Sequence, residues 1–170
     1  MKTRTGNYPI GLRVGGSAWQ KNLPSLIEWS KQNGLEALDL GRDGDVAGKV
    51  DFKEWQPMIS ADKGKRKDAV AANIEYIKAC AAYGSVNHFL VMLPEKPEAP
   101  RSENFGYMVD SFGELTATLE ANNAHIVIEG WPGPGALCCT PETLRAFFKE
   151  VKSMAFGVNY DPSHLMRMGI

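Results

Sequence analysis

The chain has 170 residues, of which 44% are hydrophobic and 23% are charged, as in an ordinary globular domain. Its formal net charge is -1, from 19 lysines and arginines against 20 aspartates and glutamates, whereas nucleic-acid-binding proteins usually carry a basic excess. No apolar run approaches the roughly 18 residues that cross a bilayer, and no signal peptide follows Met1. We therefore expect a soluble, cytoplasmic protein that binds neither nucleic acid nor a membrane.

The first part of the chain predicts short strands around one helix. Residues 10–14 and 36–40 read as strands, and the helix between them opens near Asn22, with Asn22 or Ser25 as its cap. Residues 50–52 are interpreted as a third, very short strand. The link over 41–49 is shorter than the dozen or so residues of a parallel crossover. Either the strand over 50–52 is not a parallel neighbour of the strand over 36–40, or a second helix is missing, and the missing helix is the favoured interpretation.

The rest of the chain alternates regularly between helices and strands. Helices are predicted over 64–83, 105–123 and 140–151, the last with Thr140 as its cap. Strands are predicted over 88–93, 125–129 and 156–161. This alternation indicates βαβ units and a parallel sheet, that is, the α/β class.

Polar residues follow the last two predicted strands. Glu129 ends one strand, and Asp161 ends the next. Because active sites of parallel α/β proteins lie at the carboxyl ends of strands, the two carboxylates should meet at one edge of the sheet. His164 follows Asp161 by three positions after a turn at Pro162. The three side chains suit a catalytic or divalent-metal site; the alternative is that Asp161 caps a helix and His164 makes an ordinary polar contact.

Two motifs resemble those of the xylose isomerase-like barrel superfamily. The segment Phe-Gly-Val-Asn-Tyr-Asp-Pro-Ser-His-Leu over residues 156–165 is similar to the motif of the sixth strand, and Ile128-Glu129-Gly130 to that of the fifth. The resemblance extends over residues 10–170. It implies an incomplete (β/α)8 TIM-type barrel with about six parallel strands, forming a single domain over 1–170 that lacks the last two β/α units, because such barrels typically need about 250 residues.

The resemblance also implies a function. The superfamily includes sugar isomerases, ketose 3-epimerases and inosose dehydratases, and it implies a metal-dependent isomerase or epimerase acting on a sugar or polyol by proton transfer beside a carbonyl. Glu129 and Asp161 are then expected as ligands of a divalent metal (Mn, Mg, Zn or Co), with Glu129 also as the catalytic base. His164 is expected to contact the substrate or, as the resemblance to endonuclease-like relatives implies, a metal. The histidine and second glutamate of the family's last two strands have no counterpart here, so the alternative is an inactive barrel fragment without a complete metal site.

Further residues carry weaker expectations. Trp131 is expected to line the sugar's apolar face or to pack at the rim, and Arg167 to meet an anionic substrate group or to be solvated. His88 and His125 begin strands and are expected to be structural. A homo-oligomer is expected to cover the sheet edges that missing strands leave exposed. An abasic-site endonuclease, a distant member of the superfamily, is disfavoured by the acidic charge balance.

Overall fold

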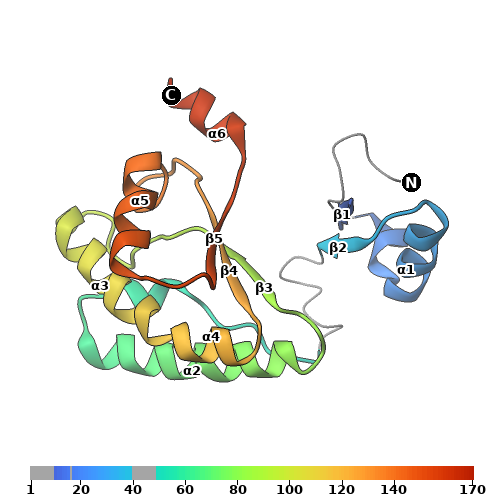
Figure 1. Cartoon of the computed structure of the whole chain (residues 1–170), viewed down its shortest axis with the longest axis horizontal. Coiled ribbons are helices and arrows are strands. Elements are labelled where there is room, and N and C mark those ends of the chain that lie inside the picture. The colour runs from blue at the N-terminus through green and yellow to red at the C-terminus, as the bar shows by residue number, and fades with distance from the viewer. Residues whose placement is uncertain (1–9, 16, 40–48) are drawn as a thin grey trace. The chain divides into compact units, whose positions relative to one another are not determined.

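The structure, a computed structural model, describes residues 10–15, 17–39 and 49–170. The chain divides into two compact units, Met1–Phe52 and Lys53–Ile170. Figure 1 labels the helices and strands of each unit. Both units contain parallel strands connected through helices, as the alternating sequence pattern predicts.

The first unit is a small β-α-β motif. Strand β1 (Gly11–Arg13) is followed by the 3-10 turn η1 (Ala18–Lys21), helix α1 (Leu23–Gln32) and strand β2 (Ala37–Asp39). The two strands pair in parallel, with Leu12 opposite Leu38. Asn22 is the helix cap, because its side chain accepts a hydrogen bond from the Ser25 backbone N–H at 3.1 Å.

The expected third strand is absent. Residues 51 and 52 form no strand and residues 49 and 50 lie in a turn, so the described residues contain five strands rather than about six. The apolar residues that come next are buried without forming a strand. Trp55 lies directly before the 3-10 turn η3 (Gln56–Ile59), and Met58 and Ile59 lie within it. Most of the 41–49 link lies outside the described residues. The helix that precedes the next strand is α2 (Lys63–Ala81).

The second unit carries a three-stranded parallel sheet in the order β3-β4-β5. After α2, its elements are β3 (Asn87–Leu90), α3 (Arg101–Glu114), α4 (Thr116–Ala121), β4 (His125–Glu129), α5 (Pro141–Glu150), β5 (Phe156–Asn159) and α6 (Pro162–Arg167). The single helix predicted over 105–123 is two helices that meet at Leu115. The predicted cap of α5 is confirmed: Thr140 and Thr143 form a reciprocal capping box.

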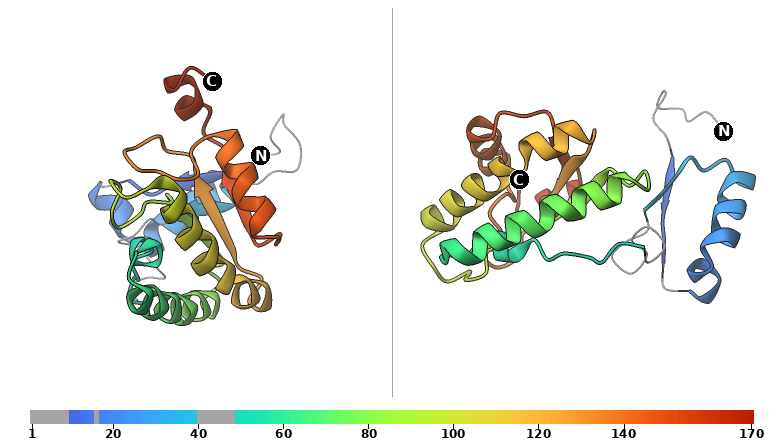
Figure 2. Two further views of the ribbon diagram at one scale, coloured as in Figure 1. Left: turned by 90° about the vertical axis from the view of Figure 1, so that its left-hand side faces the viewer. Right: turned by 90° about the horizontal axis from the view of Figure 1, so that it is seen from below.

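One face of the β3-β4-β5 sheet packs against helices. His88, Ile126 and Phe156 occupy equivalent positions on neighbouring strands and therefore share this face. The His88 ring lies 5.6 Å from Tyr76 of α2, and the Phe156 ring lies 5.4 Å from Phe147 of α5. Figure 2 shows α2, α3 and α4 gathered along the same side of the strands. The hydrophobic core of the unit lies here.

The other face, here called the site face, carries the alternate residues. At the carboxyl end of the strands it presents Glu129 directly opposite Asn159. Phe89 of this face is 46% exposed, while Val127 and Gly157 are half-buried. The site face ends at the edge of the sheet where the sequence predicts the functional site.

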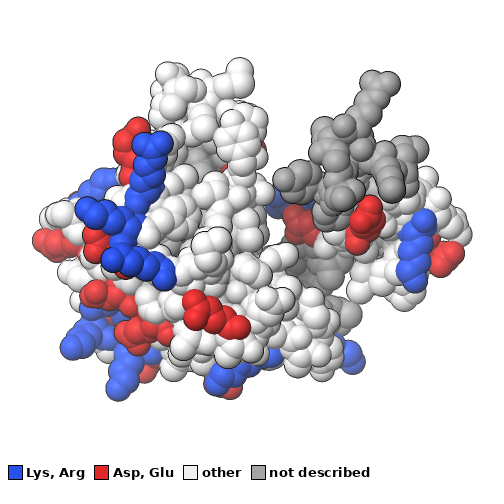
Figure 3. Space-filling view, in the orientation of Figure 1, with Lys and Arg blue, Asp and Glu red and all other residues white. Residues whose placement is uncertain are grey.

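The basic run at the start of α2 is engaged in local contacts. Lys65 forms an ion pair with Glu95, and Arg66 donates a hydrogen bond to the Ser60 carbonyl at 2.7 Å and lies 4.5 Å from the centre of the Tyr107 ring. In the view of Figure 3, both signs of charge are interleaved over the surface where α2 lies. Two basic side chains of α2 therefore have partners within the second unit. In the parts of the chain that the structure describes, no helix has the length and hydropathy of a membrane span.

Candidate metal centre

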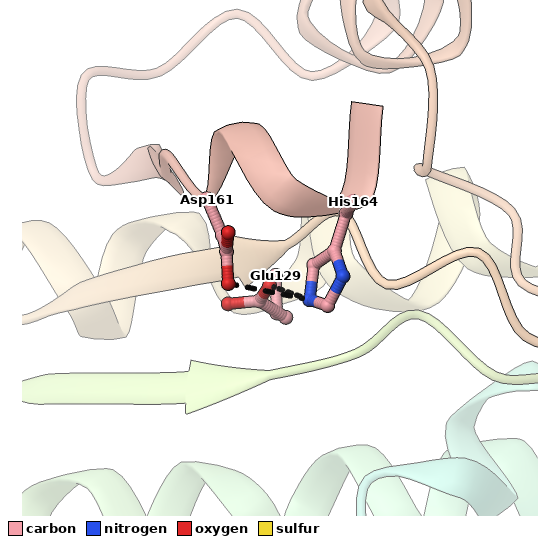
Figure 4. Close-up of side chains that lie close together, drawn as sticks. All are labelled: Glu129, Asp161 and His164. Atoms are coloured by element: carbon pink, nitrogen blue, oxygen red, sulfur yellow. Dashed lines mark ion pairs between the residues drawn. The ribbon is translucent and has the colours of Figure 1, made fainter. Parts of the chain in front are cut away.

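Glu129, Asp161 and His164 meet at the carboxyl edge of the sheet (Figure 4). Glu129 is the last residue of β4, Asp161 follows β5 by two residues, and His164 lies in the first turn of α6. One ligand atom from each side chain lies within 4.8 Å of the other two. The sequence expectation that these three residues form one oxygen and nitrogen cluster agrees with this geometry.

Glu129 and His164 are the inner pair of the cluster. Glu129 Oε1 lies 2.7 Å from His164 Nε2, with only 7% of the glutamate side chain and 16% of the histidine side chain exposed. Asp161 Oδ2 lies 3.6 Å from the same imidazole nitrogen, and its side chain is 40% exposed. Glu129 is therefore the buried carboxylate of the cluster, and Asp161 is the outer carboxylate that solvent reaches.

Asp161 caps a helix and also faces the imidazole of the cluster. Its Oδ1 caps α6 by accepting the Ser163 backbone N–H at 2.8 Å, while its Oδ2 faces His164. Pro162 at the first position of α6 fits this cap and starts the turn that brings His164 back over the edge. Hydrogen bonds from the Ser163 hydroxyl and backbone N–H, with a smaller effect of His164, hold the pKa of Asp161 below its usual range. The outer carboxylate is therefore ionised at neutral pH.

The carboxylate oxygens and imidazole nitrogen of the cluster are suited to a divalent cation. Among the described residues, the buried atoms Glu129 Oε1 and His164 Nδ1 take part in no hydrogen bond, although Oε1 and Nε2 are only 2.7 Å apart. Ligand atoms about 2.1 Å from a shared metal, at right angles to one another, are roughly 3 Å apart. Two carboxylates and one imidazole are also ligands that Mn, Zn and Co accept, and Mg is bound mainly through the carboxylates.

Asn159 is a functional candidate that the sequence analysis missed. Its side-chain Nδ2 donates to Glu129 Oε2 at 2.5 Å. The signal was available, because the two-residue period of a strand places Asn159 and Asp161 on the same face. Strand register, which pairs Asn159 with Glu129, could not be read from the sequence.

Trp131 and Arg167 lie outside the cluster. Trp131 belongs to the loop after β4, is 36% exposed and covers Gly133, where an added Cβ would come within 1.7 Å of the indole ring. Arg167 is the last residue of α6 and is exposed. In the described part of the chain, no hydrogen bond or ion pair joins either side chain to Glu129, Asp161 or His164. Their roles in binding substrate stay predictions.

The loop after β4 is anchored from α3. The Arg101 guanidinium donates to the carbonyls of Ala136 and Leu137, both at 2.8 Å. The Leu137 backbone N–H in turn donates to the Met92 carbonyl at 2.9 Å. These bonds tie the segment that follows Glu129 to the body of the unit.

The aromatic and histidine residues away from the cluster have structural positions. His88 is buried beside the rings of Trp55 and Tyr76, at 5.9 and 5.6 Å. His125 begins β4, at the end opposite Glu129. Trp19 is exposed and packs edge-on against Trp29 at 5.3 Å. The structural roles expected for the two histidines agree with these positions.

Comparison with known families supports the motif resemblance. The model of the xylose isomerase-like TIM barrel family matches residues 20–169. The chain belongs to this family. The predicted family and the incomplete barrel of parallel strands are therefore confirmed, since the five described strands lie in two parallel sheets and close no barrel. A search of curated proteins finds no match.

Three solved epimerases have similar structures. An L-ribulose 3-epimerase superposes with a TM-score of 0.70 at 15% identity, over 94% of this chain and 62% of the epimerase. A D-allulose 3-epimerase from Methylomonas sp. gives 0.57 at 14% identity, over 93% and 53%. A D-psicose 3-epimerase with D-tagatose from Clostridium cellulolyticum H10 gives 0.57 at 16%, over 89% and 53%. At these identities the likeness shows the fold, and the chain spans between 53% and 62% of the length of these enzymes.

Proposed function

We propose that the protein is a metal-dependent isomerase or epimerase of a sugar or sugar-like polyol, and that Glu129, Asp161 and His164 form its metal centre. The observation that carries this proposal is the convergence of three ligand atoms within 4.8 Å at the carboxyl edge of the sheet. Membership of the family and the fold shared with three sugar 3-epimerases support the substrate class.

In this proposal the position of each side chain in the cluster determines its role. A divalent cation held by these residues would supply Lewis-acid polarisation of the sugar carbonyl. Glu129 and Asp161 contribute the two negative charges that hold the cation. Glu129 Oε1, the oxygen that no hydrogen bond occupies in the described residues, is the atom of this carboxylate available to a cation or to a proton. His164 lies over the edge of the site, where it contacts the cation or a substrate hydroxyl.

The wider features of the proposal come from the sequence. Trp131 lines the apolar face of the sugar, and Arg167 meets an anionic group of the substrate. The protein acts in the cytoplasm in carbohydrate metabolism, as a single domain over residues 1–170 that forms homo-oligomers. In the described second unit β5 pairs with β4 alone, which leaves an edge for such an association.

Metal binding is the first test. Calorimetric titration of the chain with Mn²⁺ should show one site, which Glu129→Gln abolishes or weakens strongly. Glu114→Gln is the matched control, because Glu114 is an exposed carboxylate at the end of α3 that does not belong to the cluster. At a concentration of Mn²⁺ about 100-fold above the dissociation constant, the metal should stabilise the folded protein by about 2.7 kcal/mol. Absence of binding by the unmodified chain would contradict the proposal.

Proton transfer beside a carbonyl is the second test. The Mn²⁺-loaded chain is incubated with a panel of ketoses in deuterated water, and exchange at the carbon beside the carbonyl is followed by proton NMR. Exchange that disappears in Glu129→Gln and persists in Glu114→Gln supports the enzyme. Metal binding without exchange on any ketose favours the alternative, a barrel chain that keeps the fold without the reaction.

A further inference from the structure

We propose that Asn159 is a positioning residue for the metal centre: it holds one oxygen of Glu129 and leaves the other as the ligand atom. This inference rests on the proposed function, because it assigns a role within the same site. The observation behind it is the hydrogen bond from Asn159 Nδ2 to Glu129 Oε2 at 2.5 Å.

The register of the sheet fixes this contact. Asn159 is the Cα partner of Glu129 across the β4-β5 pair, and both side chains lie on the site face. Side chains directly opposite each other on neighbouring strands are close enough to interact without any loop having to place them. Strand pairing, which the core on the other face stabilises, therefore aims the amide at the carboxylate.

The contact divides the Glu129 carboxylate into two different oxygens. Oε2 accepts the amide N–H, whereas Oε1 lies 2.7 Å from His164 Nε2 on the side where Asp161 Oδ2 also lies. A carboxylate with both oxygens free can chelate a cation through one or both of them. With Oε2 occupied, Glu129 is restricted to binding through Oε1.

The amide is suited to this position by its chemistry. An asparagine donates without adding charge, so it stabilises a buried carboxylate without competing for the cation. An aspartate in the same place would add a third carboxylate within hydrogen-bonding distance of Glu129 and repel it. Partners that orient a metal ligand in this way typically change metal affinity by 10- to 100-fold when they are removed.

The test compares Asn159→Ala with Asn87→Ala. Asn87 is the matched control, because it lies on the site face at the opposite end of β3. Calorimetry with Mn²⁺ should show affinity 10- to 100-fold lower for Asn159→Ala and within about twofold of the unmodified chain for Asn87→Ala. The visible spectrum of bound Co²⁺, which reports coordination geometry, should change in Asn159→Ala alone.

A metal-free readout accompanies the titration. The side-chain amide of Asn159, assigned by its loss in Asn159→Ala, should show slowed hydrogen exchange in the NMR spectrum, and Glu129→Ala should abolish that protection. If Asn159→Ala does not fold, Asn159→Ser replaces it in every measurement.

The outcomes separate this inference from the proposed function. Absence of Mn²⁺ binding by the unmodified chain refutes the metal centre and this inference with it. Binding by the unmodified chain, with equal affinity and an unchanged Co²⁺ spectrum in Asn159→Ala, refutes only the role of Asn159. A lower melting temperature without any change of affinity or spectrum also refutes it, because that result describes a purely structural contact.

Discussion

Truncation of two phenylalanines should reveal which face of the β3-β4-β5 sheet is buried. Phe112 of α3 is fully buried and stacks on Trp55, with ring centres 6.3 Å apart and planes at 22°. Phe89 of β3 lies on the site face and is 46% exposed. The change Phe→Ala is the same at both positions, so the difference measures burial.

The expected magnitudes follow from this burial. Phe112→Ala removes a fully buried ring and leaves a cavity, so the free energy of unfolding should fall by about 3–5 kcal/mol. Phe89→Ala removes a ring that water already reaches over nearly half its surface, and full burial of such a side chain contributes about 1.5–3 kcal/mol. The loss at Phe89 should therefore be about 1 kcal/mol.

Urea unfolding followed by far-ultraviolet circular dichroism provides the assay, with Mn²⁺ removed by a chelator. The midpoint should fall strongly for Phe112→Ala and slightly for Phe89→Ala, with similar slopes. If the two losses of unfolding free energy agree within about 1 kcal/mol, the exposure assigned to Phe89 on the site face is refuted, since Phe89 would then be buried in solution as deeply as Phe112.

Two further predictions concern ionisable groups. Burial raises the pKa of the Cys138 thiol from 9.0 to about 12. The contribution of the buried thiol to the stability of the folded protein is therefore complete below pH 9 and lost as the pH rises towards 12. The pH dependence of stability in this window should weaken in Cys138→Ala. Mass spectrometry at pH 8.5 should find the half-buried Cys139 alkylated before Cys138. Hydrogen bonds from the backbone N–H groups of Lys65 and Gly64 lower the pKa of Asp62, the cap of α2. The contribution of the ionised Asp62 to the stability of the folded protein is present above pH 3.8 and lost as the pH falls below that value. The unmodified chain should therefore be more stable than Asp62→Asn at neutral pH, by urea midpoints, and this difference should disappear in acid. A difference that persists at pH 2 would contradict this account.

The sequence predicted the elements that local chemistry defines. The bounds of β4 are the predicted ones, because three β-branched apolar residues, Ile126, Val127 and Ile128, lie between a turn and a glycine. The start of α5 was also predicted, since the Thr140 hydroxyl accepts a backbone N–H of the first turn and Pro141 has no N–H that would need a partner there. The prediction failed at residues 50–52, where a short apolar stretch leads into the buried turn η3 and finds no strand partner.

The candidate site was only partly visible in the sequence. Two carboxylates at strand ends and a histidine three residues beyond the second are linear patterns, so Glu129, Asp161 and His164 could be selected from the sequence alone. Their roles in metal binding stay predictions. The period of the strand could place Asn159 on the same face as Asp161, but its pairing with Glu129 could not be read from the sequence, because strand register is set by tertiary packing.

By itself, then, the sequence determined an α/β chain of parallel strands, the family, and the edge of the sheet at which Glu129, Asp161 and His164 meet. These properties depend on local propensity, on hydrophobic period and on motifs, which are contiguous in the chain. Only the tertiary structure decided that Asn159 bonds Glu129, that Asp161 divides its two oxygens between a helix cap and His164, and that the Trp131 indole lies over Gly133. The physical reason is that strand register and side-chain direction are settled by packing between residues far apart in sequence, here 30 positions for Glu129 and Asn159.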